Sequence, residues 1–390
     1  MEKKIGIIGV GNCGSQIAYL AERKYNTLID SIYINTSEAD LSMVEGNIKF
    51  KIGDKEEIEG SGKNRSKMKA YLRDEIRVIL SNAVFQKTIN EKKYVFVVAS
   101  AAGGTGSGAA PVLLDVLRAC FPDVHFILVC VLPQLQASLM EQGNTLEFLD
   151  ELYTDLGDNT TYMMYDNEVT ADKSPTEGLE IVNECIVEDI RILSGIDNYA
   201  TPYDSIDEAD LESIITTPGR LLVTRVKKGL TEKTLEDAQI DDIIIKCIKQ
   251  SCNTETDRNK RVVRWGIITY FTEAVHKLYT TSLEKLREFI GTPIERFNHH
   301  AVNDKGEQFN FLYLIASGLS PINDRVKKIK DRVDELKKAL ASDDSSKYIL
   351  SGDSVAYDVL AARKKEEKRR QSIENGDISP KVIFDKFMKK

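Results

Sequence analysis

Residues 97–117 read VVASAAGGTGSGAAPVLLDVL, with four glycines, a threonine and a serine between an apolar run and a run with helical spacing. Glycines let backbone N–H groups approach an anion without obstruction, and the hydroxyls of Thr105 and Ser107 add further donors. The helix that follows would present its positive N-terminal end at the same place. This stretch therefore predicts a loop that binds an anion.

The composition is that of a globular protein. The chain has 390 residues, of which 42% are hydrophobic and 29% charged, and its formal net charge is −8. This length suffices for two domains, and no apolar run is as long as a membrane span. The six cysteines lie mostly in apolar runs without a CxxC pair, which indicates reduced thiols. We expect a cytoplasmic protein that contacts no membrane and, because it is acidic, no nucleic acid directly.

The first half of the chain alternates between two patterns. Short β-branched runs predict buried strands, and the stretches between them have helical spacing. This alternation is typical of a doubly wound α/β fold, in which helices cover both faces of a parallel sheet. The predicted strands are 4–10, 31–35, 94–99, 125–132 and 161–165, and the predicted helices are 15–23, 65–81, 109–120 and 139–156.

The second half begins with one long helical pattern, which Ser174-Pro175 opens and Gly195 closes. Beyond it, the patterns predict a smaller α/β domain with strands at 220–226, 265–270 and 309–315 and helices at 235–250, 280–289 and 322–340. We therefore expect four parts: a nucleotide-binding domain (1–173), a central helix (174–195), a smaller domain (196–340) and a charged helical tail (341–390).

Four polar loops follow predicted parallel strands, at the edge where such sheets bind their ligands. They are GVGNCGSQ (9–16), NTSEAD (35–40), AAGGTGSG (101–108) and YDNE (165–168). Because the carboxyl ends of parallel strands meet at one edge, we expect the four loops to converge on a single site.

One alternative is a Rossmann oxidoreductase that binds NAD. Gly9, Gly11 and Gly14 match its G-x-G-x-x-G fingerprint. That fold needs an acidic residue at the end of the second strand, where this chain has Asn35-Thr36, and it leaves the second glycine loop unexplained. The G-x-x-x-x-G-K-[ST] pattern of P-loop enzymes does not occur in the sequence.

The loops resemble those of the tubulin/FtsZ superfamily. AGGTGSGAAP (102–111) is similar to its signature loop, GNCGSQIA (11–18) to its first phosphate loop and NTSEADL (35–41) to its second. The matching segments follow one another in the family's order over roughly residues 3–320. The resemblance implies a tubulin-like fold and the hydrolysis of GTP to GDP and phosphate.

The resemblance also implies which residues contact the nucleotide. Glu141 would contact the ribose, Asn167 the base and Asn183 the guanine edge. The implied nucleotide-binding residues are Gly11, Asn12, Cys13, Gln16, Asn35, Gly103, Gly104, Thr105, Gly106, Ser107, Gly108, Glu141, Asn167 and Asn183.

No lysine lies in the signature loop, so we expect Mg²⁺ to neutralise much of the phosphate charge. The phosphates and water would hold this ion, without a direct side-chain ligand. The four histidines show no spacing typical of metal ligands, and we expect His299-His300 to lie at a surface or in a turn.

SIDEAD (205–210) resembles the family's catalytic loop N-x-D-x-x-D. Asp207 and Asp210 would lie on one face of a helical turn, where paired carboxylates can orient an attacking water. The same residues would also suit the acidic N-terminus of a helix. Ser205 stands where the family has asparagine, and Ala102 where it has the first glycine. A filament that binds nucleotide without hydrolysing it therefore stays open as an alternative.

In the family, the acids of one subunit complete the site of the next, which implies head-to-tail filaments. The basic tail is more similar to the plasmid and phage branch, the TubZ type, than to division proteins. This implies a bacterial protein, plasmid- or phage-encoded, that segregates DNA through an adaptor bound to the tail. The stretch RKKEEKRRQ (363–371) fits a solvated helix face equally well, and a cell-division GTPase is the nearest alternative.

Overall fold

The structure, a computed structural model, describes residues 5–53, 60, 62–156, 159–194, 206–253, 260–279 and 283–342. The chain forms two compact units, residues 1–332 and 333–390. All ten strands described below lie in the first unit. From residue 343 onward, the predicted charged tail lies outside the described residues.

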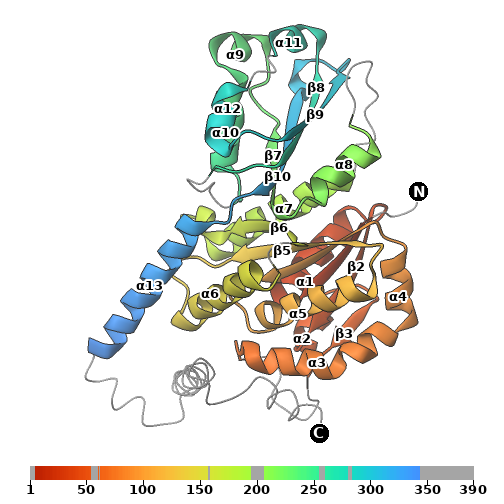
Figure 1. Cartoon of the computed structure of the whole chain (residues 1–390), viewed down its shortest axis with the longest axis vertical. Helices are drawn as coiled ribbons and strands as arrows, with labels where there is room; N and C mark the ends of the chain where they lie inside the picture. The colour runs from red at the N-terminus through yellow and green to blue at the C-terminus, as the bar shows by residue number, and fades with distance from the viewer. Residues whose placement is uncertain are drawn as a thin grey trace. The chain divides into compact units, whose positions relative to one another are not determined.

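The first unit is built on one mixed sheet with the strand order β3-β2-β1-β4-β5-β6-β7-β10-β8-β9 (Figure 1). Neighbours from β3 to β7 are parallel, β10 is antiparallel to both β7 and β8, and β8 is parallel to β9. The strands are β1 (Ile5–Val10), β2 (Ile29–Asn35), β3 (Lys49–Lys51), β4 (Tyr94–Ser100), β5 (His125–Leu132), β6 (Thr161–Asp166), β7 (Gly219–Val226), β8 (Arg264–Phe271), β9 (Glu295–Val302) and β10 (Phe311–Leu319).

Helices account for most of the remaining described residues. They are α1 (Gly11–Lys24), α2 (Glu38–Ser42), α3 (Arg65–Ser81), α4 (Ala83–Asn90), α5 (Thr105–Cys120), α6 (Leu139–Thr154), α7 (Pro175–Ser194), α8 (Glu208–Ile215), α9 (Glu232–Asp237), α10 (Ile240–Gln250), α11 (Glu273–Leu278), α12 (Glu284–Ile290) and α13 (Asn323–Ser342), with short 3-10 helices η2 (Asn167–Thr170) and η4 (Glu307–Phe309). None of the described helices combines the length and the apolar character needed to cross a membrane.

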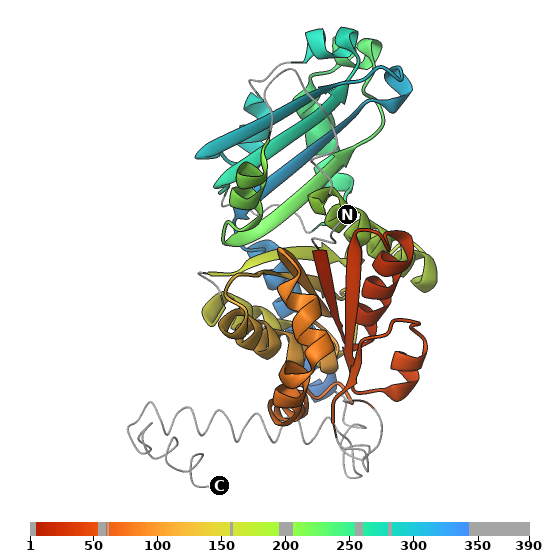
Figure 2. The same cartoon turned by 90° about the vertical axis from the view of Figure 1, so that its right-hand side faces the viewer.

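Helices cover both faces of the parallel part of the sheet, as expected for a doubly wound fold (Figure 2). Alternate residues of each strand face opposite ways, so the core has two sides. Ile5 and Ile7 belong to the cluster that includes residues of α1, α7 and α8, whereas Ile8 and Val10 belong to the cluster that includes residues of α3, α4, α5 and α6. A third cluster packs α10 and α12 against β7, β8 and β10. The predicted fold class is confirmed, and the sheet becomes mixed beyond β7, where β10 is antiparallel to its neighbours.

Several predicted boundaries differ from the structure. The helix expected at 235–250 is two helices, because Ala238 is extended (φ −141°, ψ 142°) and ends α9. Strands β3 and β9 were not predicted, since KFK is short and ERFNHHAV is largely polar. The expected division of residues 1–340 into two domains and a central helix stays a prediction.

The surface or turn position expected for His299 and His300 is wrong. Both side chains are buried in β9, with 4% and 7% exposure. The Nδ1 atom of His299 accepts from the backbone N–H of Ile206 (3.3 Å), and His300 Nδ1 lies 2.8 Å from the hydroxyl of Thr269. These partners allow imidazole rings to occupy core positions.

Candidate nucleotide site

Two glycine loops touch through their backbones at the carboxyl ends of β1 and β4. Gly11 begins α1 with φ +72°, a conformation that residues with a side chain rarely adopt. A Cβ there would lie 3.0 Å from the backbone nitrogen of Gly106, and a Cβ on Gly106 would lie 3.0 Å from the Val10 carbonyl oxygen. The two predicted phosphate loops therefore form one continuous backbone surface.

The other glycines of the GVGNCG motif have a packing role. A Cβ on Gly14 would lie 2.1 Å from the carbonyl oxygen of Val98, and a Cβ on Gly9 would lie 2.4 Å from that of Gly14. These glycines allow α1 to press against β1 and β4. The motif that suggested a dinucleotide fold thus serves in part to seat a helix on the sheet.

Helix α5 begins at Thr105, inside the glycine loop and four residues earlier than predicted. Neither α1 nor α5 has a side-chain hydrogen bond at its N-cap, whereas side chains of Ser37, Asn64 and Asn82 cap α2, α3 and α4. The first N–H groups of a helix need partners. Two uncapped helix starts on touching loops therefore offer an anion site, and the space beside Gly103 is open.

Hydrogen bonds between the loops fix their shape. The hydroxyls of Thr36 and Thr105 lie 2.9 Å apart, which joins the second loop to the signature loop. Ser107 is fully buried, and its hydroxyl donates to the carbonyl of Gly103. Asn35 is also buried, and its side-chain oxygen accepts from the backbone N–H of Thr36 (2.8 Å). These polar groups of the loops thus form hydrogen bonds with one another.

The first loop presents side chains of differing exposure. Asn12 is exposed, whereas Cys13 and Gln16 are half-buried. Burial raises the pKa of the Cys13 thiol to about 12, so the thiol stays neutral at physiological pH. A neutral thiol beside a phosphate site avoids repulsion between like charges.

Glu141 is held by its neighbours on α6 and by a lysine. Its carboxylate accepts from the backbone N–H of Ser138 (2.9 Å) in a capping box and pairs with Lys63 Nζ (3.0 Å). Burial alone would raise the pKa of Glu141, but the bonds from Ser138 and Lys63 outweigh it and lower the pKa. Glu141 is therefore a fixed anion at this end of α6.

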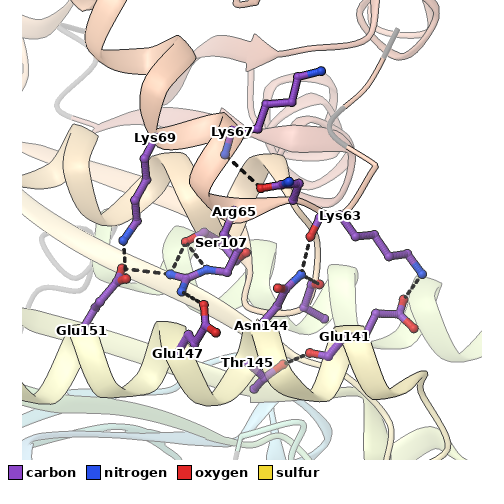
Figure 3. Close-up of polar contacts among 12 residues, drawn as sticks. Lys63, Arg65, Lys67, Lys69, Ser107, Glu141, Asn144, Thr145, Glu147 and Glu151 are labelled. Atoms are coloured by element: carbon purple, nitrogen blue, oxygen red, sulfur yellow. Dashed lines mark hydrogen bonds and ion pairs between the residues drawn. The ribbon is translucent and has the colours of Figure 1, made fainter. Parts of the chain in front are cut away.

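Asn144 is a residue of the site that the sequence analysis missed. Its amide donates to the carbonyls of Lys63 (2.9 Å) and Ala102 (3.0 Å), so it joins the segment before α3 to the signature loop (Figure 3). Its position three residues after Glu141 would have placed the two on one face of α6.

The two predicted base-reading asparagines lie on η2 and α7. The side-chain oxygen of Asn167 is buried and has no hydrogen-bond partner among the described residues. A buried acceptor of this kind is costly unless a ligand donates to it. Asn183 is half-buried on α7, the helix that contacts η2. The unpaired amide oxygen suits a donor group of a nucleotide base.

The predicted catalytic acids lie at the start of α8, in a reciprocal capping box. Asp207 Oδ1 accepts from the backbone N–H of Asp210 (2.8 Å), and Asp210 Oδ2 accepts from that of Asp207 (3.3 Å). This is the helix N-terminus that the sequence analysis weighed against the catalytic interpretation. The geometry is compatible with both, since the capping box engages one oxygen of each carboxylate. Ser205 lies outside the described residues.

Helix α8 is anchored at the edge of the sheet opposite to the glycine loops. Lys93, directly before β4, pairs with Glu208 (2.9 Å) and Glu212 (3.0 Å). His125, the first residue of β5, contacts Glu212 (3.0 Å). The bonds from Lys93 and His125 lower the pKa of Glu212. These contacts place α8 where β4 and β5 begin, whereas the signature loop lies where β4 ends.

The fold and the paired glycine loops define a nucleotide-binding α/β protein without a P-loop. Residues 4–173 match the model of the Tubulin/FtsZ family, GTPase domain. Residues 4–173 are thus a tubulin/FtsZ-family GTPase domain, which decides against the oxidoreductase alternative.

Among curated relatives, the chain is similar to the tubulin-like protein TubZ of Clostridium botulinum C phage, with 22% identity over the full length of both. It is 26% identical to the tubulin-like protein CetZ2 of Haloferax volcanii over 197 residues, which cover 49% of this chain and about half (53%) of CetZ2.

Solved structures of a TubZ and of a CetZ2 protein share the fold. The crystal structure of Clostridium botulinum phage c-st TubZ has a TM-score of 0.68 at 19% identity, over 87% of this chain and 100% of that one. Haloferax volcanii CetZ2, solved as a GTPγS-bound protofilament, has a TM-score of 0.67 at 17% identity, over 86% and 99% of the two chains.

Proposed function

We propose that the chain polymerises head to tail into dynamic filaments, in which Asp207 and Asp210 of one subunit complete the GTP site of the next. One observation carries this proposal: the glycine loops lie at the carboxyl ends of the central strands, and the acids lie on the helix at the amino ends of the same strands. Strand β4 alone has seven residues, so at about 3.3 Å per residue it separates these ends by roughly 20 Å. Within one subunit the acids are too far away to orient a water at the phosphates.

A head-to-tail contact removes this separation, because it brings the acidic edge of one copy to the loop edge of another. Such a contact is heterologous and generates an open filament when it does not close into a ring. The CetZ2 relative solved as a protofilament supports this arrangement. Hydrolysis would then depend on assembly.

The glycine loops would hold the triphosphate through their backbone N–H groups and the N-termini of α1 and α5. Asn167 and Asn183 would contact the base, and Glu141 the ribose. Mg²⁺ would be bound by the phosphates and water and would supply charge neutralisation. The carboxylates of Asp207 and Asp210 would orient the attacking water.

The best variants for testing the acids are asparagine substitutions. Asparagine keeps a side-chain oxygen that can accept the same backbone hydrogen bonds, so Asp207→Asn at the N-cap and Asp210→Asn at N3 should preserve the capping box while removing the charge. Alanine would also remove the cap, at a cost of about 1 kcal/mol in stability. A loss of activity in the asparagine variants therefore reports on the carboxylates themselves.

The decisive experiment mixes two proteins. Wild-type chain is held below the concentration at which its GTP turnover and light scattering rise, and D210N, expected to be at least 100-fold less active alone, is added. If the site is shared, the D210N subunits supply nucleotide loops and wild-type acids cleave their GTP, so turnover per wild-type subunit rises several-fold.

The control is Glu273→Gln, which removes the charge of an exposed carboxylate that pairs with Lys277 on α11. It should hydrolyse GTP and assemble as the wild type does. Turnover proportional to wild-type concentration alone, with no effect of added D210N, would mean a self-contained site and would refute the shared one. An unaltered rate in D207N and D210N would leave the acids without a role in hydrolysis.

For the biological role, we propose segregation of plasmid or phage DNA through an adaptor that binds the tail. The full-length similarity to a phage-encoded TubZ supports this role. Similarity to the CetZ proteins extends over about half of the chain or somewhat more. Cell division is the competing role within the family.

A further inference from the structure

Arg65 occupies a buried position next to the signature loop. It is the first residue of α3, and only 4% of it is exposed. A buried guanidinium normally requires partners for its charge and for its N–H groups. Its partners come from two other helices, α5 and α6 (Figure 3).

The partner on α5 is a backbone carbonyl. Arg65 Nη2 donates to the carbonyl oxygen of Ser107 at 2.8 Å, and Nε donates to the same oxygen at 3.3 Å. Ser107 is the third residue of α5, in the turn that offers its N–H groups to the proposed phosphate site.

The sequence explains why this carbonyl is available. In an α-helix, the carbonyl of residue 107 accepts from the N–H of residue 111, and residue 111 is proline. Proline has no N–H, and its ring crowds the carbonyl four residues earlier. The Ser107 carbonyl thus lacks its helical partner, and the Arg65 side chain replaces it.

Two glutamates on α6 hold the guanidinium in place. Nη1 pairs with Glu147 (3.2 Å) and Nη2 with Glu151 (2.9 Å), and Lys69 also contacts Glu151. The Arg65 charge is therefore balanced inside the protein, and its donors have fixed directions. The network links α3, α5 and α6 at the signature loop.

A second contact fixes the same two helix starts. A Cβ on Gly108 would lie 2.7 Å from the carbonyl oxygen of Arg65, so the first turn of α5 touches the backbone of α3. No residue other than glycine fits at 108 without moving one of the helices.

We infer that Arg65 is a positioning residue of the GTP site, which replaces the N–H that Pro111 lacks and so fixes the first turn of α5. This inference rests on the proposed nucleotide site. It assigns to α3 and α6 a role in setting the geometry of the phosphate-binding N–H groups, although no Arg65 atom touches the nucleotide.

The test uses Arg65→Lys and Pro111→Ala in the full chain, alone and combined. A lysine keeps the charge but lacks the planar guanidinium, through which Arg65 makes two bonds to Ser107 and contacts both glutamates. We expect R65K to weaken GTP and GDP binding at least tenfold, measured below the assembly concentration. P111A supplies an N–H to the Ser107 carbonyl and should restore most of the lost affinity in the double variant, while changing the wild type less than threefold.

The matched control is Arg118→Lys on the same helix, because Arg118 donates to Thr160 (2.8 Å) at the far end of α5. R118K should bind nucleotide as the wild type does. A folded R65K with unchanged affinity would overturn the inference, and so would a loss that P111A does not restore, since a purely structural defect would not respond to an added N–H at 111.

If R65K does not fold, the double variant E147Q/E151Q replaces it, since it keeps Arg65 and removes the charges that orient it. The same loss of affinity and the same rescue by P111A are expected, and unchanged binding contradicts the inference. Failure of the proposed function is distinct from all of these results, because in that case the wild-type chain itself would not bind GTP.

Discussion

At the scale of single residues, glycines and buried polar groups decide the site. The glycine pattern alone predicted a loop for an anion. Which glycines face the ligand and which seat a helix follows only from the structure, because Gly14 touches the Val98 carbonyl, a neighbour 84 positions away in the sequence. Arg65 and Asn144 were missed for a related reason: each bonds a backbone carbonyl of a distant segment, and no residue type marks such a partner in the sequence.

This distinction predicts opposite outcomes for two alanine substitutions. Gly14→Ala would place a methyl group 2.1 Å from the Val98 carbonyl oxygen, so α1 or β4 must move, and we expect a loss of roughly 1–3 kcal/mol or more in unfolding free energy. Gly103→Ala meets no atom within 4 Å and should leave stability within about 0.5 kcal/mol of the wild type.

Urea denaturation of both variants at one pH measures the difference. Equal stability of G14A and the wild type would show that α1 is not pressed against β4 as described. A strongly destabilised G103A would show that the space beside the signature loop is filled.

At the scale of helices and strands, periodicity predicted most elements but not how they pair. The strands rich in Val and Ile were found, because burial on both faces of a parallel sheet leaves long apolar runs. Strand β9 was not predicted, because its sequence is largely polar. Its histidines can be buried since they have partners on other elements, among them Thr269 on β8. The order of the strands in the sheet, and hence its mixed half, depends on pairings between distant segments.

The link between α1 and α7 gives a prediction on pH. Glu188 on α7 accepts from the Tyr25 hydroxyl and pairs with Lys24 (3.0 Å). Burial would raise the pKa of Glu188, but the bonds from Tyr25 and Lys24 lower it from the usual 4.5 to about 2. Because the folded pKa is the lower one, this carboxylate stabilises the protein above pH 4.5 and loses that contribution between about pH 4.5 and 2.

Glu188→Gln should therefore lower the free energy of unfolding at pH 7. The difference in unfolding free energy between the variant and the wild type should become smaller as the pH falls through this window. Unfolding free energies of both proteins from pH 7 to 2.5 provide the measurement. Glu184→Gln, which removes a more exposed carboxylate that also pairs with Lys24, is the control and should reduce stability at pH 7 less than E188Q does. A constant deficit of E188Q across the window would contradict the prediction.

At the scale of the whole molecule, the sequence led to the tubulin/FtsZ family through the order of its loops, and the family match over residues 4–173 agrees. The separation of loops and acids to opposite edges required the structure. This separation follows from the contacts of Lys93 and His125 with α8. The sequence places these two residues before β4 and at the start of β5, but it does not show that α8 lies beside them.

The biological role is tested at this scale too. In the organism that carries the gene, D210N should form filaments that persist. If the role is segregation, these filaments should cause loss of an extrachromosomal DNA element at normal cell length, measured by plasmid or prophage retention over generations. Elongated cells with blocked septa and full retention of such DNA would favour the division role and contradict segregation.

The opposed edges have a last consequence for the proposed filament, namely that its two ends differ chemically. At one end the last subunit presents acids with no phosphate to attack, and at the other it presents a nucleotide that no acids cover. That outermost nucleotide would be hydrolysed later than those in the interior, so the nucleotide state would differ between this end and the rest of the filament. A subunit that joins at the end with the uncovered nucleotide would keep its triphosphate until the next subunit covers it, and loss of this end subunit would expose subunits whose nucleotide has been hydrolysed.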